Sequence, residues 1–504
     1  RYFRALPESQ KVVSLEDLTP LIELFHHMAK AGKYDEAFNL FYGRMYKPCF
    51  YRFSAYHLII ELLMEILPGG EIDGRMSLLK EAAYQACTLN YLANSYSLSG
   101  QPTNAVPLYL LNNKLQEKDD NKKNLAIGLG NAAGDQMSIG QLSTASGHLR
   151  KNIAFDREIK DEFYETYGHL ELGRLLAFQG RATTYGVSLN PSLDGSANAE
   201  EEFAKSTAYF EKTNNYQGLS VTSAYRSLSA LMQVRLAAAQ QGMENLVLKH
   251  SREALHQARQ ALTFSEETIK TQYPVPRDFV QAYWLLGEVL ICYGMNRSAG
   301  AKNIDPLEFE ILFYDEYFQW VVETEIVTTV KPLTAAGHCL HEAICRCRKA
   351  NMVDIEPDIL LALVRFDVAQ NKPPDETLLK EAFEIALRSG YRRVLADLHL
   401  FCGQVLLQFK DMKSLLGLTA VEHLQKTKEY ALDVSDISHL YSPVKTTADD
   451  FYKGIPEYDM LKRGLTDEER IQNGYWVAYQ IAETLLKESH SNATNTSVAT
   501  NTDN

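Results

Sequence analysis

The sequence predicts an all-α protein, a solenoid built from stacked pairs of antiparallel helices. Glycine recurs at an unbroken 40-residue interval at Gly100, Gly140 and Gly180. A small residue stands seven positions before each of these glycines, at Ala93, Ala133 and Gly173. Apolar residues are spaced by three and four along nearly the whole chain, and strand-like alternation is scarce. Self-similarity with this period is typical of stacked helical repeats.

Close contact between helices gives this pattern its physical reason. A small side chain at Ala93 or Ala133 allows the partner helix to approach the backbone, where a large one would overpack the contact by roughly 1–3 kcal/mol. The glycine seven residues later is expected to end the first helix in a left-handed turn. Ala105 and Ala145 should have the same packing role in the second helix of each pair.

The helix pairs follow in order along the chain. The first pair turns at Gly32, and a further helix near 51–67 ends at Pro68. The second and third pairs occupy 91–109 and 131–149, and the fourth begins at 169–180 and resumes near Ala199. The fifth covers 217–240 and 244–268. The sixth covers 282–294 and 334–351, the seventh 359–370 and 376–391, and the eighth 396–409 and 419–432.

These pairs predict four regions. Residues 1–18 would be a lead-in from a longer protein, since the chain begins at Arg1. Residues 19–437 would form the array, with insertions at about 181–197 and 295–331. Residues 438–489 would be an irregular segment and a capping helix at 474–488. Residues 490–504, rich in Ser, Thr, Asn and Ala, would be disordered.

Composition narrows the classes of partner. The net charge of −13 argues against nucleic acid, which needs clustered Lys and Arg. The charge instead favours a protein or basic peptide ligand. No run approaches 18 apolar residues, so no membrane span is expected. Seven scattered cysteines suit reduced thiols in the cytoplasm.

The sequence offers little evidence of catalysis. No phosphate-binding loop is present, and GLGNAAG at 128–134 is interpreted as close helix packing. In HCLHEAICRC, the side chains of His338, His341 and Cys345 would share a helix face and could hold zinc with one more ligand. An ordinary repeat helix with buried cysteines and exposed histidines is the favoured alternative. We therefore expect no enzyme, cofactor or metal in this chain.

The repeating residues resemble those of the tetratricopeptide repeat. The second pair fits its pattern closely, with Leu92, Ala93, Tyr96, Gly100, Ala105 and Tyr109. Gln136 replaces the usual aromatic residue in the third pair, and Asn371 stands where glycine is expected in the seventh. The resemblance covers most of 19–430. It implies a right-handed superhelix of about eight or nine helix pairs, with the first helix of each pair on the concave wall.

Carried over by position, the resemblance nominates ligand-binding residues on that wall. They are Asn90, Asn94, Asn131, Glu171, Arg174, Glu288, Arg365 and Gln404. Each could equally be a solvated polar residue of an amphipathic helix. As a set, they are expected to be too polar for a core.

Several longer phrases are similar to the C-terminal repeat arrays of prokaryotic STAND-class signalling NTPases. They include KKNLAIGLGNAAGDQMSIG at 122–140 and RSGYRRVLADLHLFCGQVLL at 388–407. This resemblance implies a ligand sensor that follows missing effector and NTPase domains, many of which are thought to act in anti-phage defence. Ligand binding would release the switch and drive oligomerisation. The alternative is a scaffold that joins proteins without switching.

The insertion at 303–330 combines acidic residues with aromatic ones, including Phe313, Tyr317 and Trp320. Aromatic anchors among carboxylates could receive a basic, apolar element of a partner protein. In the alternative interpretation, this insertion is an extra helix whose aromatic residues pack on the solenoid.

Overall fold

The computed structural model describes residues 12–67, 78–182, 198–240, 242–271, 275–298, 332–436 and 456–499. Within these ranges there is no β-strand, and the only extended pairing is an isolated bridge between Leu415 and Leu418. Consecutive helices pack against each other along the chain. The prediction of an all-α, solenoid-like architecture is therefore confirmed.

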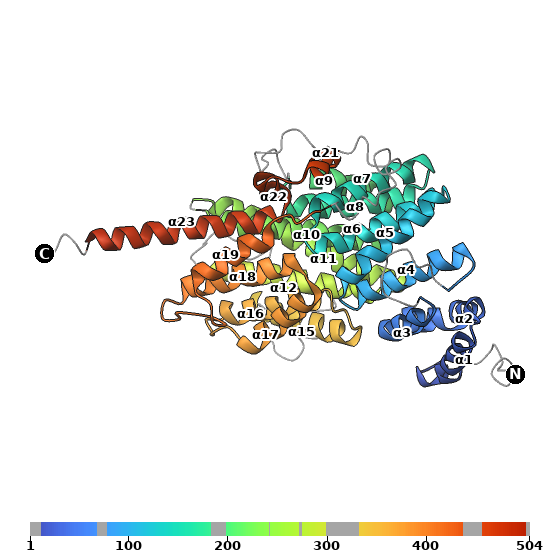
Figure 1. Ribbon diagram of the computed structural model, residues 1–504. Helices are drawn as coiled ribbons and strands as arrows, with labels where there is room; N and C mark the ends of the chain where they lie inside the picture. The colour runs from blue at the N-terminus through green and yellow to red at the C-terminus, as the bar shows by residue number, and fades with distance from the viewer. Residues whose placement is uncertain are drawn as a thin grey trace.

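The N-terminal helices lie at one end of the molecule (Figure 1). They are η2 (Glu16–Leu18), α1 (Thr19–Lys30), α2 (Tyr34–Leu40), the π-helical turns η3 (Phe41–Met45) and η4 (Pro48–Arg52), and α3 (Tyr56–Ile66). The predicted turn at Gly32 separates α1 from α2, with φ +71° at the glycine.

The long central helices follow. They are α4 (Ala82–Leu98), α5 (Pro102–Lys118), α6 (Lys122–Ser138), α7 (Leu142–Glu158), α8 (Glu162–Phe178), α9 (Ala199–Lys212), α10 (Tyr216–Ala238), α11 (Glu244–Thr271) and α12 (Pro276–Ser298). The last helices are α15 (Pro332–Lys349), α16 (Glu356–Ala369), α17 (Glu376–Ser389), α18 (Arg392–Gln408), α19 (Ala420–Ala431), α21 (Pro456–Arg463), α22 (Asp467–Asn473) and α23 (Trp476–Ala499).

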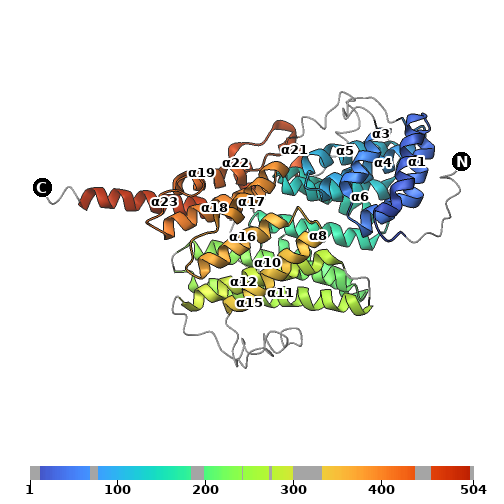
Figure 2. The same ribbon diagram turned by 90° about the horizontal axis from the view of Figure 1, so that it is seen from below.

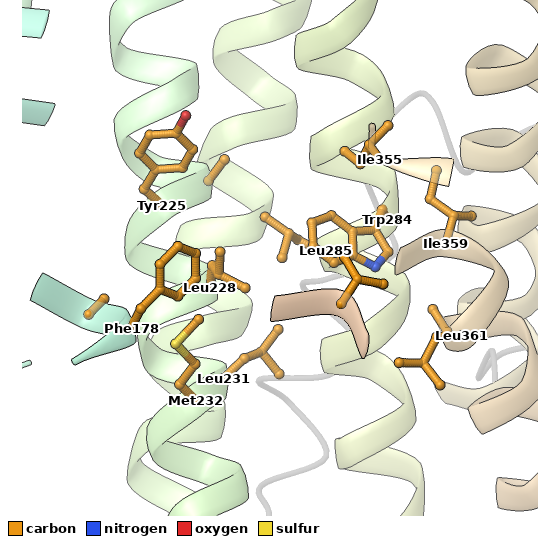
Figure 3. Close-up of a cluster of buried hydrophobic side chains, with 14 of the residues drawn as sticks. Phe178, Tyr225, Leu228, Leu231, Met232, Trp284, Leu285, Ile355, Ile359 and Leu361 are labelled. Atoms are coloured by element: carbon orange, nitrogen blue, oxygen red, sulfur yellow. The ribbon is translucent and has the colours of Figure 1, made fainter. Parts of the chain in front are cut away.

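Alternate helices form an inner layer. In the series α6, α8, α10, α12, α16 and α18, each helix contacts the next as well as its neighbours in sequence. Figure 3 shows the apolar core between these helices, where Phe178 of α8 lies beside Leu228 and Met232 of α10. Trp284 of α12 and Ile359 of α16 continue the same buried cluster.

The periodic small residues act as the sequence predicted. Gly100, Gly140 and Gly180 have φ values of +78°, +82° and +72° and follow the ends of α4, α6 and α8. A Cβ atom added to Gly173 would lie 2.6 Å from the Phe203 ring, so α8 and α9 pack closely at this point. Asn371, which replaces the expected glycine, adopts φ +60°. Asparagine tolerates this left-handed region better than most residues.

The array also closes on itself. Helix α18 contacts α6, α21 contacts α7, and α23 contacts α10, α18 and α19. Figure 2 shows helices from the C-terminal part of the chain beside helices from its N-terminal part. A Cβ atom added to Gly100 would lie 2.6 Å from the side chain of Val353. At Gly140 it would lie 2.9 Å from Arg392, and at Gly180 it would lie 2.5 Å from Trp476. The repeated glycines thus also allow close contact with the C-terminal part of the chain.

The C-terminal region contains more helix than the sequence pattern indicates. The segment predicted to be irregular contains α21 and α22, and α23 continues to Ala499, within the predicted disordered tail. Residues Phe313, Tyr317 and Trp320 lie outside the described residues, as does most of each predicted insertion. None of the described helices is long and apolar enough to cross a membrane.

Candidate functional site: a cavity inside the helical array

Polar side chains of α4, α6 and α8 meet at a cavity of about 630 Å³. Four of the nominated residues line it: Asn94 of α4, Asn131 of α6, and Glu171 and Arg174 of α8. Asn131 and Glu171 are 40 residues apart and occupy equivalent positions in successive repeats. The repeat register therefore brings these four residues to one cavity.

A further part of the cavity wall comes from the C-terminal half of the chain. Arg277 lies at the start of α12, Asp354 lies two residues before α16, and Tyr391 immediately precedes α18. These residues reach the cavity because the array closes, with α18 against α6. The cavity is consequently lined by residues from both halves of the sequence.

Small residues on α6 leave the space open. Gly130 and Gly134 are four residues apart, so they lie on the same face of α6, and both line the cavity. A Cβ atom added to Gly134 would meet nothing within 4 Å, apart from its own helix backbone and chain neighbours. Gly128, by contrast, would place a Cβ atom 2.0 Å from Asn113, which agrees with close helix packing for this part of GLGNAAG.

Aromatic side chains contribute much of the remaining wall. Phe163, Tyr164 and Tyr167 come from the first turns of α8, and Tyr109 comes from α5. Tyr109 donates a hydrogen bond of 2.7 Å to Asn94 and so fixes that amide at the cavity wall. The cavity therefore combines ring faces with amide and charged groups, as ligand sites usually do.

Both arginines on the wall have a carboxylate partner. The Nη2 atom of Arg174 lies 2.5 Å from Oε2 of Glu171. The other carboxylate oxygen of Glu171 accepts a hydrogen bond of 2.9 Å from the hydroxyl of Tyr225. Arg277 binds both carboxylate oxygens of Asp354. Burial alone would raise the pKa of Asp354, but the charge and hydrogen bonds of Arg277 hold it below its ordinary value. The two pairs are thus internally neutral.

Asp135 differs from these paired residues. It lines the cavity with 9% of its surface exposed, and its Oδ1 atom accepts a hydrogen bond of 2.7 Å from Ser97. Its Oδ2 atom is buried and has no hydrogen-bond partner among the described residues. Burial raises the pKa of Asp135 to about 7, since the hydrogen bond from Ser97 offsets burial only in part and Asp354 adds repulsion.

The other nominated residues lie elsewhere. Glu288 of α12 is 2% exposed and accepts hydrogen bonds of 3.0 Å from Arg235 and 2.7 Å from Arg365. The expectation that the set is too polar for a core is wrong for Glu288, because two guanidinium groups compensate its buried charge. Asn90 is half-buried on α4 and Gln404 is exposed on α18, and neither lines the cavity.

The cysteine and histidine cluster on α15 does not assemble a metal site. His341 and Cys345 are exposed, with 3.6 Å between the imidazole Nε2 and the sulfur, whereas Cys339 and Cys347 are buried. In the part of the chain that the structure describes, no group of three His, Cys, Asp or Glu side chains could hold a metal ion.

Sequence reasoning missed Asp135, Arg277, Asp354 and Tyr391 as site residues. The repeat pattern contained a signal for Asp135, since it follows Asn131 by four residues and adjoins Gly134, which places it on the same face of α6. The other three residues belong to later helices or the turns before them, and only the closure of the array brings them to the cavity.

The structure thus has an α-helical array with a half-open cavity, lined by residues from both halves of the sequence. No protein-family model matches the chain, and no curated protein matches its sequence.

Proposed function

We propose that this chain is a right-handed tetratricopeptide-like superhelix that binds a protein or peptide ligand in the cavity. It would serve as the ligand sensor of a larger STAND-type signalling NTPase, in prokaryotic anti-phage defence. The repeat residues and the longer phrases at 122–140 and 388–407 support the family assignment. The cavity supports the binding role, because polar residues of equivalent repeat positions converge there.

The two-sided wall is the observation that carries this proposal. Asn131 and Arg174 belong to early helices, whereas Arg277 and Tyr391 belong to the later part of the chain. A ligand that contacts both walls binds the closed array better than an opened one, and only such a difference in affinity can shift a conformational equilibrium. The closure of the array is thus the element that would carry the signal to the upstream domains.

Filling the cavity tests the binding role. Gly134→Leu places a side chain in the open space and replaces a helical glycine, so the array should stay folded. Gly43→Leu is the matched control, because Gly43 also meets no atom within 4 Å and does not line the cavity. Peptides selected from a random display library on the wild-type protein should bind Gly43→Leu equally and lose at least about tenfold in affinity for Gly134→Leu.

Equal binding to a folded Gly134→Leu variant, or a selection that yields no cavity-dependent peptide, would contradict the proposal. Hydrogen exchange at the contact of α6 with α18 separates sensing from scaffolding. A selected peptide that slows exchange there supports the sensor, and one that binds without changing it supports a non-switching scaffold.

The coding sequence upstream of Arg1 tests the assignment to the signalling NTPases. A phosphate-binding loop in the same reading frame supports it, and a start codon directly before Arg1 supports the scaffold.

A further inference from the structure

We infer that the cavity receives a cationic group of its ligand, an ammonium or a guanidinium, with Asp135 as the counter-charge. The inference deepens the proposed function and rests on it for the choice of cavity. It names a chemical class of ligand and one residue that recognises it.

The charges on the wall favour a cation. The ionisable residues that line the cavity comprise three carboxylates, Asp135, Glu171 and Asp354, and two guanidiniums, Arg174 and Arg277. Each guanidinium is paired with its own carboxylate. Within the described part of the chain, Asp135 is therefore the lining carboxylate without a cationic partner, and its charged form would gain most from a positive charge supplied by a ligand.

The geometry of Asp135 supplies an independent reason. A buried polar atom usually has a hydrogen-bond partner, and leaving one without a partner costs about 1–3 kcal/mol. Oδ2 of Asp135 lacks one among the described residues, although Ser97 holds the other oxygen in place. A hydrogen-bond donor of a ligand that enters the cavity could provide the missing partner for this oxygen.

The aromatic residues fit the same ligand. The ring faces of tyrosine and phenylalanine attract ammonium and guanidinium groups. Phe163, Tyr164 and Tyr167 of α8 line the cavity, as do the almost fully buried Tyr109 and Tyr391. The Tyr164 ring already attracts one cation of this chain, since the Nζ atom of Lys123 lies 5.5 Å from its centre. This chain already uses such contacts nearby, since the guanidinium of Arg174 lies 5.0 Å from the centre of the Tyr225 ring.

Proton release should accompany binding. The groups that act on Asp135 are Ser97, Asp354, Tyr109 and Tyr391, and burial keeps its pKa near 7. A bound cation favours the ionised form, so binding should strengthen from pH 6 to pH 8. The ionised fraction rises by about tenfold over this range, which sets the expected gain in affinity.

The cation could belong to a lysine or arginine of a peptide or to a free amine. The probes are therefore N-acetyl-Gly-Arg-Gly-amide, its neutral Gln analogue and the free amine agmatine, each followed by ligand-observed NMR. The wild-type protein should bind the Arg peptide, and the Gln peptide should bind at least about tenfold more weakly. Tighter binding of agmatine than of the Arg peptide would identify a free amine as the source.

Asp135→Asn tests the residue and keeps an acceptor for Ser97. Asp156→Asn is the matched control, because Asp156 is also buried, also has one oxygen without a partner among the described residues, and also has a pKa raised to about 7, but does not line the cavity. Affinity for the Arg peptide should fall about tenfold or more in Asp135→Asn and stay unchanged in Asp156→Asn.

An equal affinity for the Gln peptide, or an equal loss in both variants, would overturn the inference. Failure of this inference can be told from failure of the proposed function. If peptides selected on the wild-type protein lose binding to Gly134→Leu but need no basic residue, the cavity is a binding site and the assignment of a cationic ligand is wrong.

Discussion

The carboxylate of Asp433 caps helix α7 at Ser143, a residue 290 positions earlier in the chain. Both the backbone N–H and the hydroxyl of Ser143 donate to the same Asp433 oxygen, and the hydroxyl of Ser435 accepts from the backbone N–H of Thr144. The residue before α7, Gln141, makes no side-chain cap of its own, whereas Asp161 caps α8 locally. The first turn of α7 is therefore completed by the closure of the array.

Asp433→Ala should loosen this closure. The change removes the acceptor of three hydrogen bonds, two from Ser143 and one from the Ser435 backbone, and leaves buried donors behind. We expect the free energy of unfolding to fall by about 2–4 kcal/mol and hydrogen exchange to become faster in the first turn of α7. Exchange should also become faster in α22, because the backbone N–H of Asp433 donates to the carbonyl of Arg470 in that helix and the Arg470 guanidinium donates to the carbonyl of Asp433.

Asp161→Ala is the control for this change, since it removes a local cap. It should cost about 1 kcal/mol and leave exchange in α22 unchanged. If Asp433→Ala affects α7 alone, the capping bond does not hold the C-terminal segment in place.

Gly180→Ala should lower the free energy of unfolding more than Gly32→Ala does, although both glycines have a positive φ. The left-handed conformation alone costs alanine about 1–2 kcal/mol, and this is the full cost expected at Gly32, where the added Cβ atom meets nothing within 4 Å. At Gly180 the Cβ atom would lie 2.5 Å from the Trp476 ring, so we expect about 1–3 kcal/mol more.

Chemical denaturation of the two variants measures this difference. Adding Trp476→Leu should reduce the cost of Gly180→Ala, because the clash is then removed. Equal costs at both positions would mean that closure does not depend on a glycine at 180.

Local periodicity explains how much of this fold could be predicted. The spacing of Ala133, Gly140 and Ala145 predicted the helix pairs and the turns between them. Such a prediction is possible because apolar spacing, close helix contact and helix termination each depend on residues within one or two helical turns. The same register placed Asn131 and Arg174 on the inner face. Whether that face meets solvent or another helix depends on distant packing, so Glu288 occupies an equivalent face yet lies in the interior.

The closure of the array could not be predicted from the sequence, because it depends on packing between distant helices. Asp433 reaches Ser143, and Arg277 reaches the cavity, through contacts between residues far apart in the sequence. No residue pattern within one repeat reports which helices meet after a complete turn of the array.

Glu288→Gln should destabilise the array strongly. The carboxylate lies between Arg235 and Arg365, and burial, which would raise its pKa, is outweighed by these two charges, so the pKa stays below its ordinary value. Removing the charge deprives two half-buried guanidiniums of their nearest carboxylate, at a cost of about 3–5 kcal/mol. Glu376→Gln, which removes an exposed pair with Lys380, should cost at most about 0.5 kcal/mol. Similar unfolding midpoints for the two variants would contradict this role of Glu288.

Asp135→Asn should stabilise the protein at pH 8 and not at pH 3. Below its ordinary pKa of 3.8, Asp135 is protonated in both the folded and the unfolded chain and contributes no difference. Between that value and about 7 the unfolded chain releases the proton first, so the stability of the wild-type protein falls as pH rises. Above pH 7 the penalty is constant and reaches at most about 4 kcal/mol, at 1.36 kcal/mol per pKa unit. Asparagine cannot ionise and escapes this penalty while it still accepts from Ser97. Unfolding midpoints of both proteins from pH 3 to pH 8 should therefore diverge as pH rises, and parallel curves would show that the buried carboxyl has an ordinary pKa.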